Sequence, residues 1–259
     1  MYANTDWLEL PRDVMSLIYT KLGALHILYG AQSVCSSWRN LSKEPHLYRS
    51  IDLRTNNIAS DMGYRGIDVN KLVKEAVDRS CGQLVEFIGD DWFQCDDEHL
   101  RYVVDKSIAL KCLVLDLKRS RLNDEEVFTG VIRKVSFLED FRLSFDHWPL
   151  ELTEAVGEWC PKLRCLRFSW NSYYGCSLYE EDRWSEVLIK LVRKVPSLEE
   201  LELCYFEFPA ELIKEVGLSC AQLKCLRLNN EDWQRSPDDV EAYGIAGRIP
   251  QLRRLYLST

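Results

Sequence analysis

Two patterns of apolar residues divide the chain. Between residues 10 and 48, apolar positions recur at helical spacing in three short stretches. From residue 84 onward the pattern becomes L-x-x-L-x-L, with phenylalanine in place of some leucines. The end of this motif alternates apolar and polar positions, which is the period of a short strand. We therefore expect a helical N-terminal segment followed by a region in which strands recur.

The three apolar stretches of the N-terminal segment predict three short helices. The first is expected to start at Pro11, because proline suits the first helical position, and to end at Gly23, because glycine suits the position after a helix. The second surrounds Leu28, and the third runs from Val34 and stops before Pro45. Three helices in about forty residues cannot bury all their apolar side chains among themselves. Part of this surface is therefore expected to contact another protein.

The strand motif returns six times in full, after a degenerate copy that contains Leu84 and Phe87. The first leucines of neighbouring copies lie 25 to 35 residues apart, which is near the range of leucine-rich repeats. The full copies are Leu110/Leu113/Leu115, Leu138/Phe141/Leu143, Leu163/Leu166/Phe168, Leu198/Leu201/Leu203, Leu223/Leu226/Leu228 and Leu252/Leu255/Leu257.

Helical spacing fills the intervals between the strand motifs. It is clearest from Trp184 to Val195 and from Val127 to Val135. Strand and helix in alternation predict an α/β fold, a curved solenoid with parallel strands on its concave face and helices outside. We expect a helical domain over residues 1–53, a polar connection over 54–68, and about seven repeats over 69–259. Leu53 is expected to end a first strand that joins the helical domain to the solenoid.

A longer period of 60 residues places the cysteines. The segment from Val156 to Arg167 returns from Val216 to Arg227, with glycine and both cysteines at the same positions. Two C-x4-C pairs, Cys160/Cys165 and Cys220/Cys225, are a possible zinc site. The periodic recurrence favours small buried residues instead, and we place Cys81 and Cys112 at equivalent positions of earlier repeats. No metal or other cofactor is expected.

The N-terminal segment resembles the F-box. Leu10-Pro11, then Val34-Cys35-x-x-Trp38-Arg39, then Pro45-x-Leu47-Tyr48 follow one another in the order of that family. The resemblance implies binding to a Skp-family adaptor and, through it, to a cullin in an SCF ubiquitin ligase. A helical cap on the following domain is the alternative. The adaptor contacts that the resemblance implies are Leu10, Pro11, Val14, Ile18, Leu22, Leu28, Val34 and Trp38.

The region after residue 69 resembles the repeat domain of F-box/leucine-rich-repeat proteins, most closely the small plant members. That resemblance implies a non-catalytic subunit whose repeats select a target protein for ubiquitination. A scaffold that binds a partner without ubiquitin transfer is the second hypothesis. An enzyme on a solenoid frame is the third, although the common nucleotide-, zinc- and serine-hydrolase motifs are missing from the sequence.

The polar positions of the strands give candidate residues for target binding. The residue between the last two apolar positions of each motif should form one row across the sheet, because adjacent strands lie about 4.8 Å apart. Its arginines could clamp a carboxylate or phosphate of a partner, or could form a charge ladder with the glutamate, and both can hold. The row is Val114, Arg142, Arg167, Glu202, Arg227 and Tyr256.

Aromatic residues in the longest repeat are a second group of candidates. Trp170, Tyr173 and Tyr174 lie in the 35-residue interval, whose extra segment is polar. Inserted loops of repeat proteins often lie on a binding face, and Trp and Tyr often supply much of the binding energy.

Charge and composition exclude some classes of partner. The formal net charge is −8 and the pI is near 5.2, whereas nucleic acids and anionic membranes require a basic surface. The longest apolar run is well short of the ~20 residues of a membrane helix. The first residues lack the basic and apolar regions of a signal peptide. We expect a cytoplasmic or nuclear protein.

Overall fold

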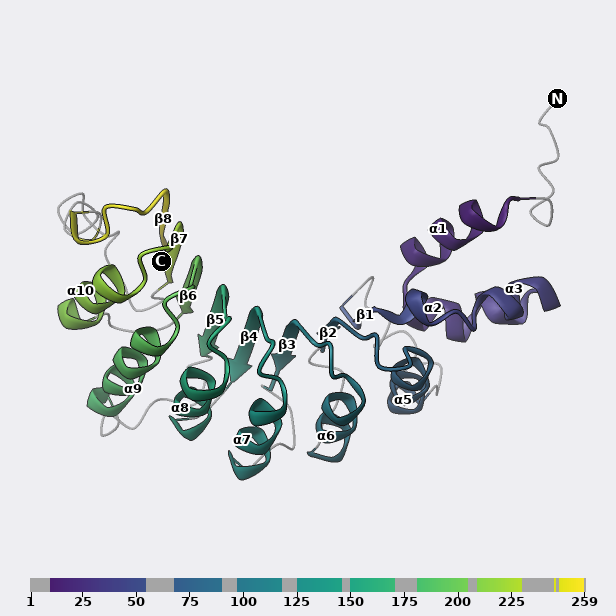
Figure 1. Cartoon of the computed structure of the whole chain (residues 1–259), viewed down its shortest axis with the longest axis horizontal. Coiled ribbons are helices and arrows are strands. Elements are labelled where there is room, and N and C mark those ends of the chain that lie inside the picture. Colours follow the sequence, from purple (N-terminus) through teal and green to yellow (C-terminus); the bar gives the residue numbers. More distant parts are fainter. Residues whose placement is uncertain are drawn as a thin grey trace.

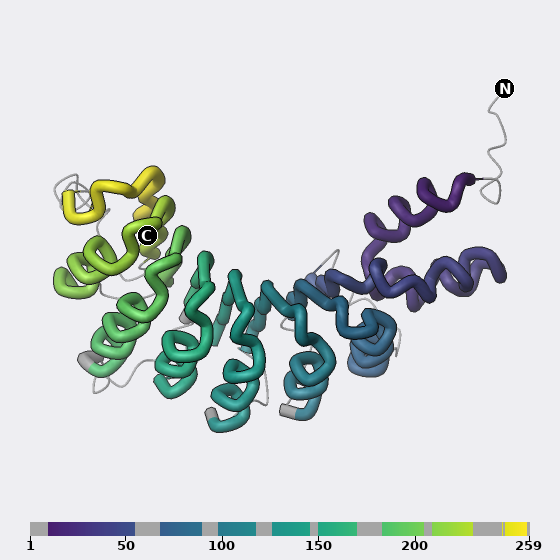
Figure 2. Tube along the Cα trace, in the orientation of Figure 1, coloured from purple at the N-terminus to yellow at the C-terminus, as the bar shows by residue number. Residues whose placement is uncertain are grey.

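The computed structural model describes residues 10–54, 68–89, 97–117, 125–145, 150–170, 181–204, 209–229, 245 and 247–258. These residues form an arc, with strands on its inner face, helices on its outer face, and a group of helices at its N-terminal end (Figure 1). The trace in Figure 2 shows each outer helix passing through a turn to the strand that follows it. The predicted α/β solenoid is confirmed.

The N-terminal group of helices, here called the helical module, spans residues 10–48. Its elements are α1 (Arg12–Leu22), α2 (Ala24–Tyr29), the 3-10 turn η1 (Ala31–Ser33), α3 (Ser36–Leu41) and the 3-10 turn η2 (Pro45–Tyr48). Strand β1 (Ser50–Asp52) follows directly and pairs with the first strand of the repeats. The module is therefore continuous with the sheet.

Eight parallel strands follow one another across the sheet in chain order. After β1 they are β2 (Glu86–Ile88), β3 (Cys112–Asp116), β4 (Asp140–Phe145), β5 (Cys165–Trp170), β6 (Glu200–Cys204), β7 (Cys225–Asn229) and β8 (Arg254–Ser258). The helices outside them are α5 (Val69–Arg79), α6 (Asp97–Lys106), α7 (Glu125–Lys134), α8 (Leu150–Trp159), α9 (Glu181–Lys194) and α10 (Ala210–Ser219).

The strand motifs align in register, and this alignment builds the core. Leu113 pairs with Phe141, Phe141 with Leu166, and the row continues to Leu255 on β8. The leucines and phenylalanines of β3 to β7 are buried against the helices. Phe168 contacts Phe141 and Phe145 edge-on, with ring centroids 6.1 and 6.0 Å apart. Burying each such side chain contributes about 1.5–3 kcal/mol, so stacking supplies a core that one repeat lacks.

A ladder of charged residues runs along the edge where the strands begin. The residue after the first leucine of each motif donates its backbone N–H to the equivalent residue of the preceding repeat, as Glu139 does to Lys111 at 2.8 Å. From Lys111 to Lys224 the side chains at this position alternate in sign. Lys111 pairs with Glu139 at 2.7 Å, and Arg164 pairs with Glu199 at 2.5 Å. Exposed pairs of this kind add little stability. Their alternation instead matches each repeat to the next.

The 60-residue period corresponds to close packing between repeats. A Cβ on Gly157 would lie 3.1 Å from Leu191 Cα, and one on Gly217 would lie 2.2 Å from the Arg248 carbonyl oxygen. Cys160 and Cys220 are fully buried, and each thiol lies within 4 Å of a backbone carbonyl of the preceding repeat. Glycine and cysteine therefore recur because neighbouring repeats approach closely at these points.

The prediction for Cys81 was wrong, because this cysteine is exposed. The turn after α5 is one residue longer than the later turns, so Ser80 takes the buried position that Val135 and Cys160 hold in their repeats. Cys81 and Gly82 then adopt positive φ angles of 49° and 79° outside the core. A left-handed pair of residues accommodates the extra length of the turn.

Among the described residues, no single helix is long and apolar enough to cross a membrane. Helix α1 together with residues 24–33 meets the length and composition criteria, but the two parts are bent by 111°.

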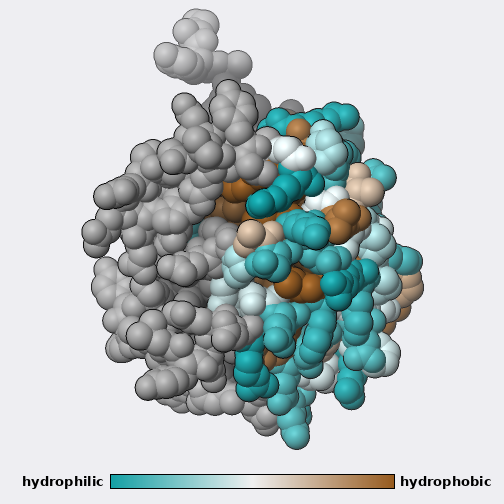
Figure 3. All heavy atoms as spheres, turned by 90° about the vertical axis from the view of Figure 1, so that its left-hand side faces the viewer, coloured by the Kyte–Doolittle hydropathy of each residue, from teal (hydrophilic) through white to brown (hydrophobic). Residues whose placement is uncertain are grey.

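The C-terminal end of the sheet is less covered than its centre. Leu252, Leu255 and Leu257 are only partly buried, whereas their equivalents in the preceding repeat are buried. Figure 3 looks toward this end of the molecule and shows apolar side chains among hydrophilic ones on the part that is coloured.

Candidate interaction surfaces

Helix α1 carries more apolar side chains than one face can bury. A helix turns by about 100° per residue, so Met15 and Tyr19 point one way and Val14 and Leu17 another. Met15 and Tyr19 are buried in the module, while Val14 is exposed and Leu17 is 60% exposed. The exposed stripe has no covering within the described chain, and the solvent-facing leucine is available to a partner.

Helix α1 ends at Gly23 as predicted and begins one residue later than predicted, with Pro11 as its N-cap. Pro11 immediately precedes the first helical residue, and its carbonyl accepts a hydrogen bond from Met15 N–H at 3.0 Å. Gly23 ends the helix with a φ of 81°, a value that favours glycine. The chain turns sharply there, so α1 projects from the rest of the module (Figure 1).

Polar contacts fasten α1 to the rest of the module. The buried Tyr19 hydroxyl donates to the Trp38 carbonyl at 3.2 Å, and the two rings pack edge-on with centroids 5.9 Å apart. Burial raises the pKa of Tyr19 to about 12, so this hydroxyl keeps its proton. Arg12 forms an ion pair with Glu44 at the far end of the module. These contacts hold the exposed stripe of α1 in a fixed position.

The Cys35-x-x-Trp38 spacing also has a structural reason. Cys35 is the N-cap of α3, and its sulfur accepts a hydrogen bond from Trp38 N–H at 3.5 Å. Trp38 lies three residues after Cys35, and an N-cap side chain usually accepts from the backbone N–H two or three residues after it. The cysteine therefore positions the tryptophan that packs on Tyr19.

The residues expected to contact an adaptor differ in exposure. Val14, Leu22 and Val34 are exposed apolar side chains, and Val34 is 61% exposed. Pro11, just before α1, is also exposed. Leu10, Ile18 and Trp38 are partly buried against the core. Leu28 is only 3% exposed and belongs to the core, so its side chain is not part of the exposed surface on which an adaptor contact was expected. Leu17 was missing from the expected set, although the second stripe of α1 could have revealed it.

The polar row on the concave face is assembled as its spacing predicts. Val114, Arg142, Arg167, Glu202, Arg227 and Tyr256 are register partners across β3 to β8. The charge ladder is present, because Glu202 pairs with Arg167 at 2.6 Å and with Arg227 at 3.2 Å. The Arg227 guanidinium also lies 4.8 Å from the centre of the Tyr256 ring. A clamp on a partner stays a prediction.

Arg142 is held by a different carboxylate. Its guanidinium donates to both oxygens of Asp140 on the same strand, at 2.9 and 2.7 Å, and this hydrogen bonding raises the pKa of Arg142. A bidentate pair fixes the plane of the guanidinium. The remaining N–H groups are those available to a ligand, and the three arginines therefore form a polar face of defined geometry.

Two cysteines face the same side of the sheet as these arginines. Cys112 and Cys165 are the register partners of Asp140 on its two neighbouring strands. Burial and the Asp140 charge raise the pKa of each thiol to about 12. A protonated thiol is a poor nucleophile and a poor metal ligand. Among the described residues, no group of three or more His, Cys, Asp or Glu side chains could hold a metal ion.

The aromatic candidates of the longest repeat are not tested. Tyr173 and Tyr174 lie outside the described residues. The backbone of Trp170 ends β5, but its side chain is not among the parts that the structure describes.

Comparison with known proteins identifies the two parts. A family described as F-box-like matches residues 7–54, which include the helical module and β1. The F-box protein SKIP19 of Arabidopsis thaliana is 30% identical over 98% of this chain and 61% of its own length. Putative F-box/LRR-repeat protein 23 of the same plant is 29% identical over 97% of this chain and 42% of its own.

A third Arabidopsis relative is closer in length. Putative F-box/LRR-repeat protein 9 is 29% identical over 87% of this chain and 85% of its own length. The chain spans less than two thirds of each of the two relatives named before it. Its own geometry shows the repeats, and the family match shows the module. The chain therefore has an F-box-like domain at residues 7–54 followed by a solenoid of repeats, and along most of its length it is similar to plant F-box and F-box/LRR-repeat proteins.

Proposed function

We propose that this chain is the substrate-recognition subunit of an SCF-type ubiquitin ligase in the cytoplasm or nucleus. The helical module binds a Skp-family adaptor, and through it a cullin, while the solenoid binds the target protein. The observation that carries the proposal is the uncovered apolar stripe of α1, within a domain that matches the F-box-like family. In this proposal the chain supplies binding surfaces, and other subunits of the ligase catalyse ubiquitin transfer.

The exposed apolar residues of the module, on α1 and at Val34, suit a permanent protein partner. Leu17 and Val34 are among the most exposed large apolar residues of the described chain, and both belong to a module of about forty residues. Covering them removes apolar surface from water at about 25 cal/mol for each Å². The module is too small to gain this by internal rearrangement, so the gain must come from association.

A titration of the purified chain with a purified Skp-family adaptor tests the module. The double variant Leu17→Ala/Val34→Ala should weaken binding by about 2 kcal/mol, roughly thirtyfold. The matched control is Ile108→Ala/Phe137→Ala, which truncates two equally exposed apolar residues on the turns of the solenoid. This control should bind as the parent does. Equal affinity of all three proteins would contradict the proposed adaptor surface.

Co-purification distinguishes the ligase from a scaffold without ubiquitin transfer. Recovery of both adaptor and cullin with the chain supports the ligase, whereas recovery of adaptor without cullin supports the scaffold. Targets are best captured with the Leu17→Ala/Val34→Ala variant, since loss of adaptor binding protects them from degradation. Deletion of the module is less suitable, because β1 and the end of α5 depend on it.

A further inference from the structure

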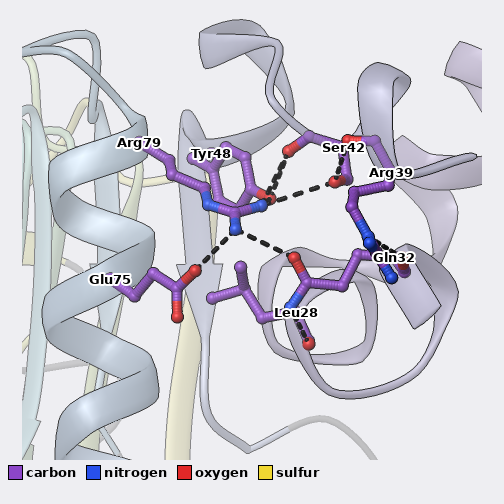
Figure 4. Close-up of polar contacts among 7 residues, drawn as sticks. All are labelled: Leu28, Gln32, Arg39, Ser42, Tyr48, Glu75 and Arg79. Atoms are coloured by element: carbon purple, nitrogen blue, oxygen red, sulfur yellow. Dashed lines mark hydrogen bonds and ion pairs between the residues drawn. The ribbon is translucent and has the colours of Figure 1, made fainter. Parts of the chain in front are cut away.

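Arg79 joins the helical module to the solenoid. It is the last residue of α5, and Figure 4 shows its guanidinium between that helix and the module. One terminal nitrogen donates to the Ser42 carbonyl at 3.2 Å and to the Tyr48 hydroxyl at 3.1 Å. The other donates to Gln32 Oε1 at 2.8 Å and to Glu75 Oε1 at 2.5 Å. A single side chain therefore contacts three separate parts of the module.

The next two repeats use the equivalent position to contact the repeat before them. Arg79 precedes the buried turn residue Ser80, as Lys106 precedes Ser107 and Lys134 precedes Val135. Lys106 pairs with Asp78 on α5 at 3.7 Å, and Lys134 pairs with Asp105 on α6. The module stands where a preceding repeat would stand, and Arg79 makes the corresponding contact to it. The module is thus packed as the first unit of the stack.

The contact that Arg79 makes is much less exposed than the later ones. Its side chain is 22% exposed, while those of Lys106 and Lys134 are more than half exposed. Tyr48 is buried, lies 5.8 Å from the guanidinium, and donates to the Ser42 carbonyl at 2.6 Å. Charged hydrogen bonds between partly buried groups are strong and directional. An ammonium group could not reach these partners together, because it lacks the planar fork of arginine.

The other contacts of the junction are less directional. Leu47 and Ile51 share the apolar core with Val73 and Val77, and such packing is not directional. Strand β1 adds only three paired residues. We propose that Arg79 is the positioning residue that fixes the angle between the helical module and the concave face. The angle itself is a property of this chain alone, and its consequence for ubiquitin transfer rests on the proposed function.

A distance measurement tests the angle without any partner. Spin labels carried by unnatural amino acids replace the exposed Lys21 on α1 and Glu158 on α8, which leaves the native cysteines unlabelled. The parent should give one narrow distance distribution, and Arg79→Lys, which keeps the charge, should widen it. The matched control Lys134→Ala removes the equivalent exposed cation and should leave it narrow. A narrow, unshifted distribution for Arg79→Lys would overturn the proposal.

A second variant separates positioning from loss of folding. Gln32→Ala removes one contact from the side of the module and leaves every charge in place, so it should also widen the distribution if Arg79→Lys does not fold. Hydrogen exchange should accelerate in η2 and β1 for both variants and stay unchanged in β4 to β6. Parent-like exchange in η2 and β1, together with an unchanged distribution for a folded variant, would mean that packing alone sets the angle.

The functional readout is a split between binding and transfer. In Arg79→Lys, affinity for adaptor and for a captured target should stay unchanged, while ubiquitin transfer to that target falls by about tenfold, because misplaced reactants react slowly. Transfer at the parent rate despite a widened distribution would overturn this consequence. If the parent binds no adaptor, the proposed function fails, and the distance measurement still decides the role of Arg79.

Discussion

The helical module and the concave face of the solenoid expose opposite kinds of surface. The module leaves Leu17 and Val34 in solvent, whereas the described strands of the central repeats bury their leucines and present paired charges on the concave face. A stack of repeats can satisfy its apolar side chains by adding neighbours, and a module of three helices cannot. The difference teaches that one chain can carry an exposed apolar surface on one part and a polar surface on another.

The largest effect is expected from the centre of the stack. Phe168→Ala removes a fully buried ring that contacts two other phenylalanines, and should lower the free energy of unfolding by about 3–5 kcal/mol. Urea unfolding followed by circular dichroism measures it. Ile108→Ala, on an exposed turn, should stay within about 0.5 kcal/mol of the parent. Similar losses in both variants would mean that the repeats are not packed as described.

Trp38 and Leu17 sharpen the comparison within the module. Trp38→Ala should lower both thermal stability and adaptor affinity, because this ring packs on Tyr19 and is still partly exposed. Leu17→Ala should lower affinity by about 1–2 kcal/mol and leave stability unchanged. Thermal unfolding and calorimetric titration of both variants give the two numbers. A Leu17 variant that loses stability would place that side chain inside the module.

The concave face should respond to salt, unlike the apolar stripe. Arg142→Glu/Arg167→Glu should reduce capture of a target, and the difference from the parent should shrink as salt rises, because charges are screened over about 8 Å at physiological ionic strength. Adaptor affinity should stay constant. If Arg142 and Arg167 serve only their ion pairs with Asp140 and Glu202, thermal stability falls and capture per folded molecule is unchanged.

The smallest expected effect is a change in how stability depends on acid pH. Hydrogen bonds from Arg193 and Ser219 lower the pKa of Glu215 from its usual value near 4.5 to about 2. A depressed carboxyl pKa contributes stability that is present above the unfolded-state value and lost as pH falls through the folded-state value. The urea midpoint should therefore fall between pH 5 and pH 2, and Glu215→Gln should show a shallower fall. If the urea midpoints of the parent and of Glu215→Gln fall equally with pH, the Arg193–Glu215 pair does not contribute to the acid dependence of stability.

Much of the solenoid followed from the sequence because its signals are local and repeated. The motif from Leu138 to Leu143 set strand, register and buried face together, and each later copy repeated the same constraint. The helices from Val127 and Trp184 were equally plain from their spacing. Repetition failed only where the chain departed from it, as in the longer turn at Cys81.

The surfaces were harder to predict, because exposure depends on which of several apolar stripes the fold covers. Spacing along α1 showed that Val14, Leu17 and Ile18 are on a helix, and tertiary packing decided that Met15 and Tyr19 go inside. Arg79 carried no sequence signal for this role, since its partners in the module are 31 to 47 residues away in the chain. Its importance appears only when the module stands beside α5.

The order of the strands has a consequence for how the chain folds during synthesis. Each described strand pairs with the one made just before it, from β1 to β8, and β1 comes directly from the helical module. A nascent chain that leaves the ribosome N-terminus first can therefore add one repeat at a time onto a finished template. None of the described strands from β2 to β8 needs a segment that is translated later in order to pair with a neighbour. The module would then act first as the folded template on which the repeats assemble. In the proposed function it would bind the adaptor only afterwards.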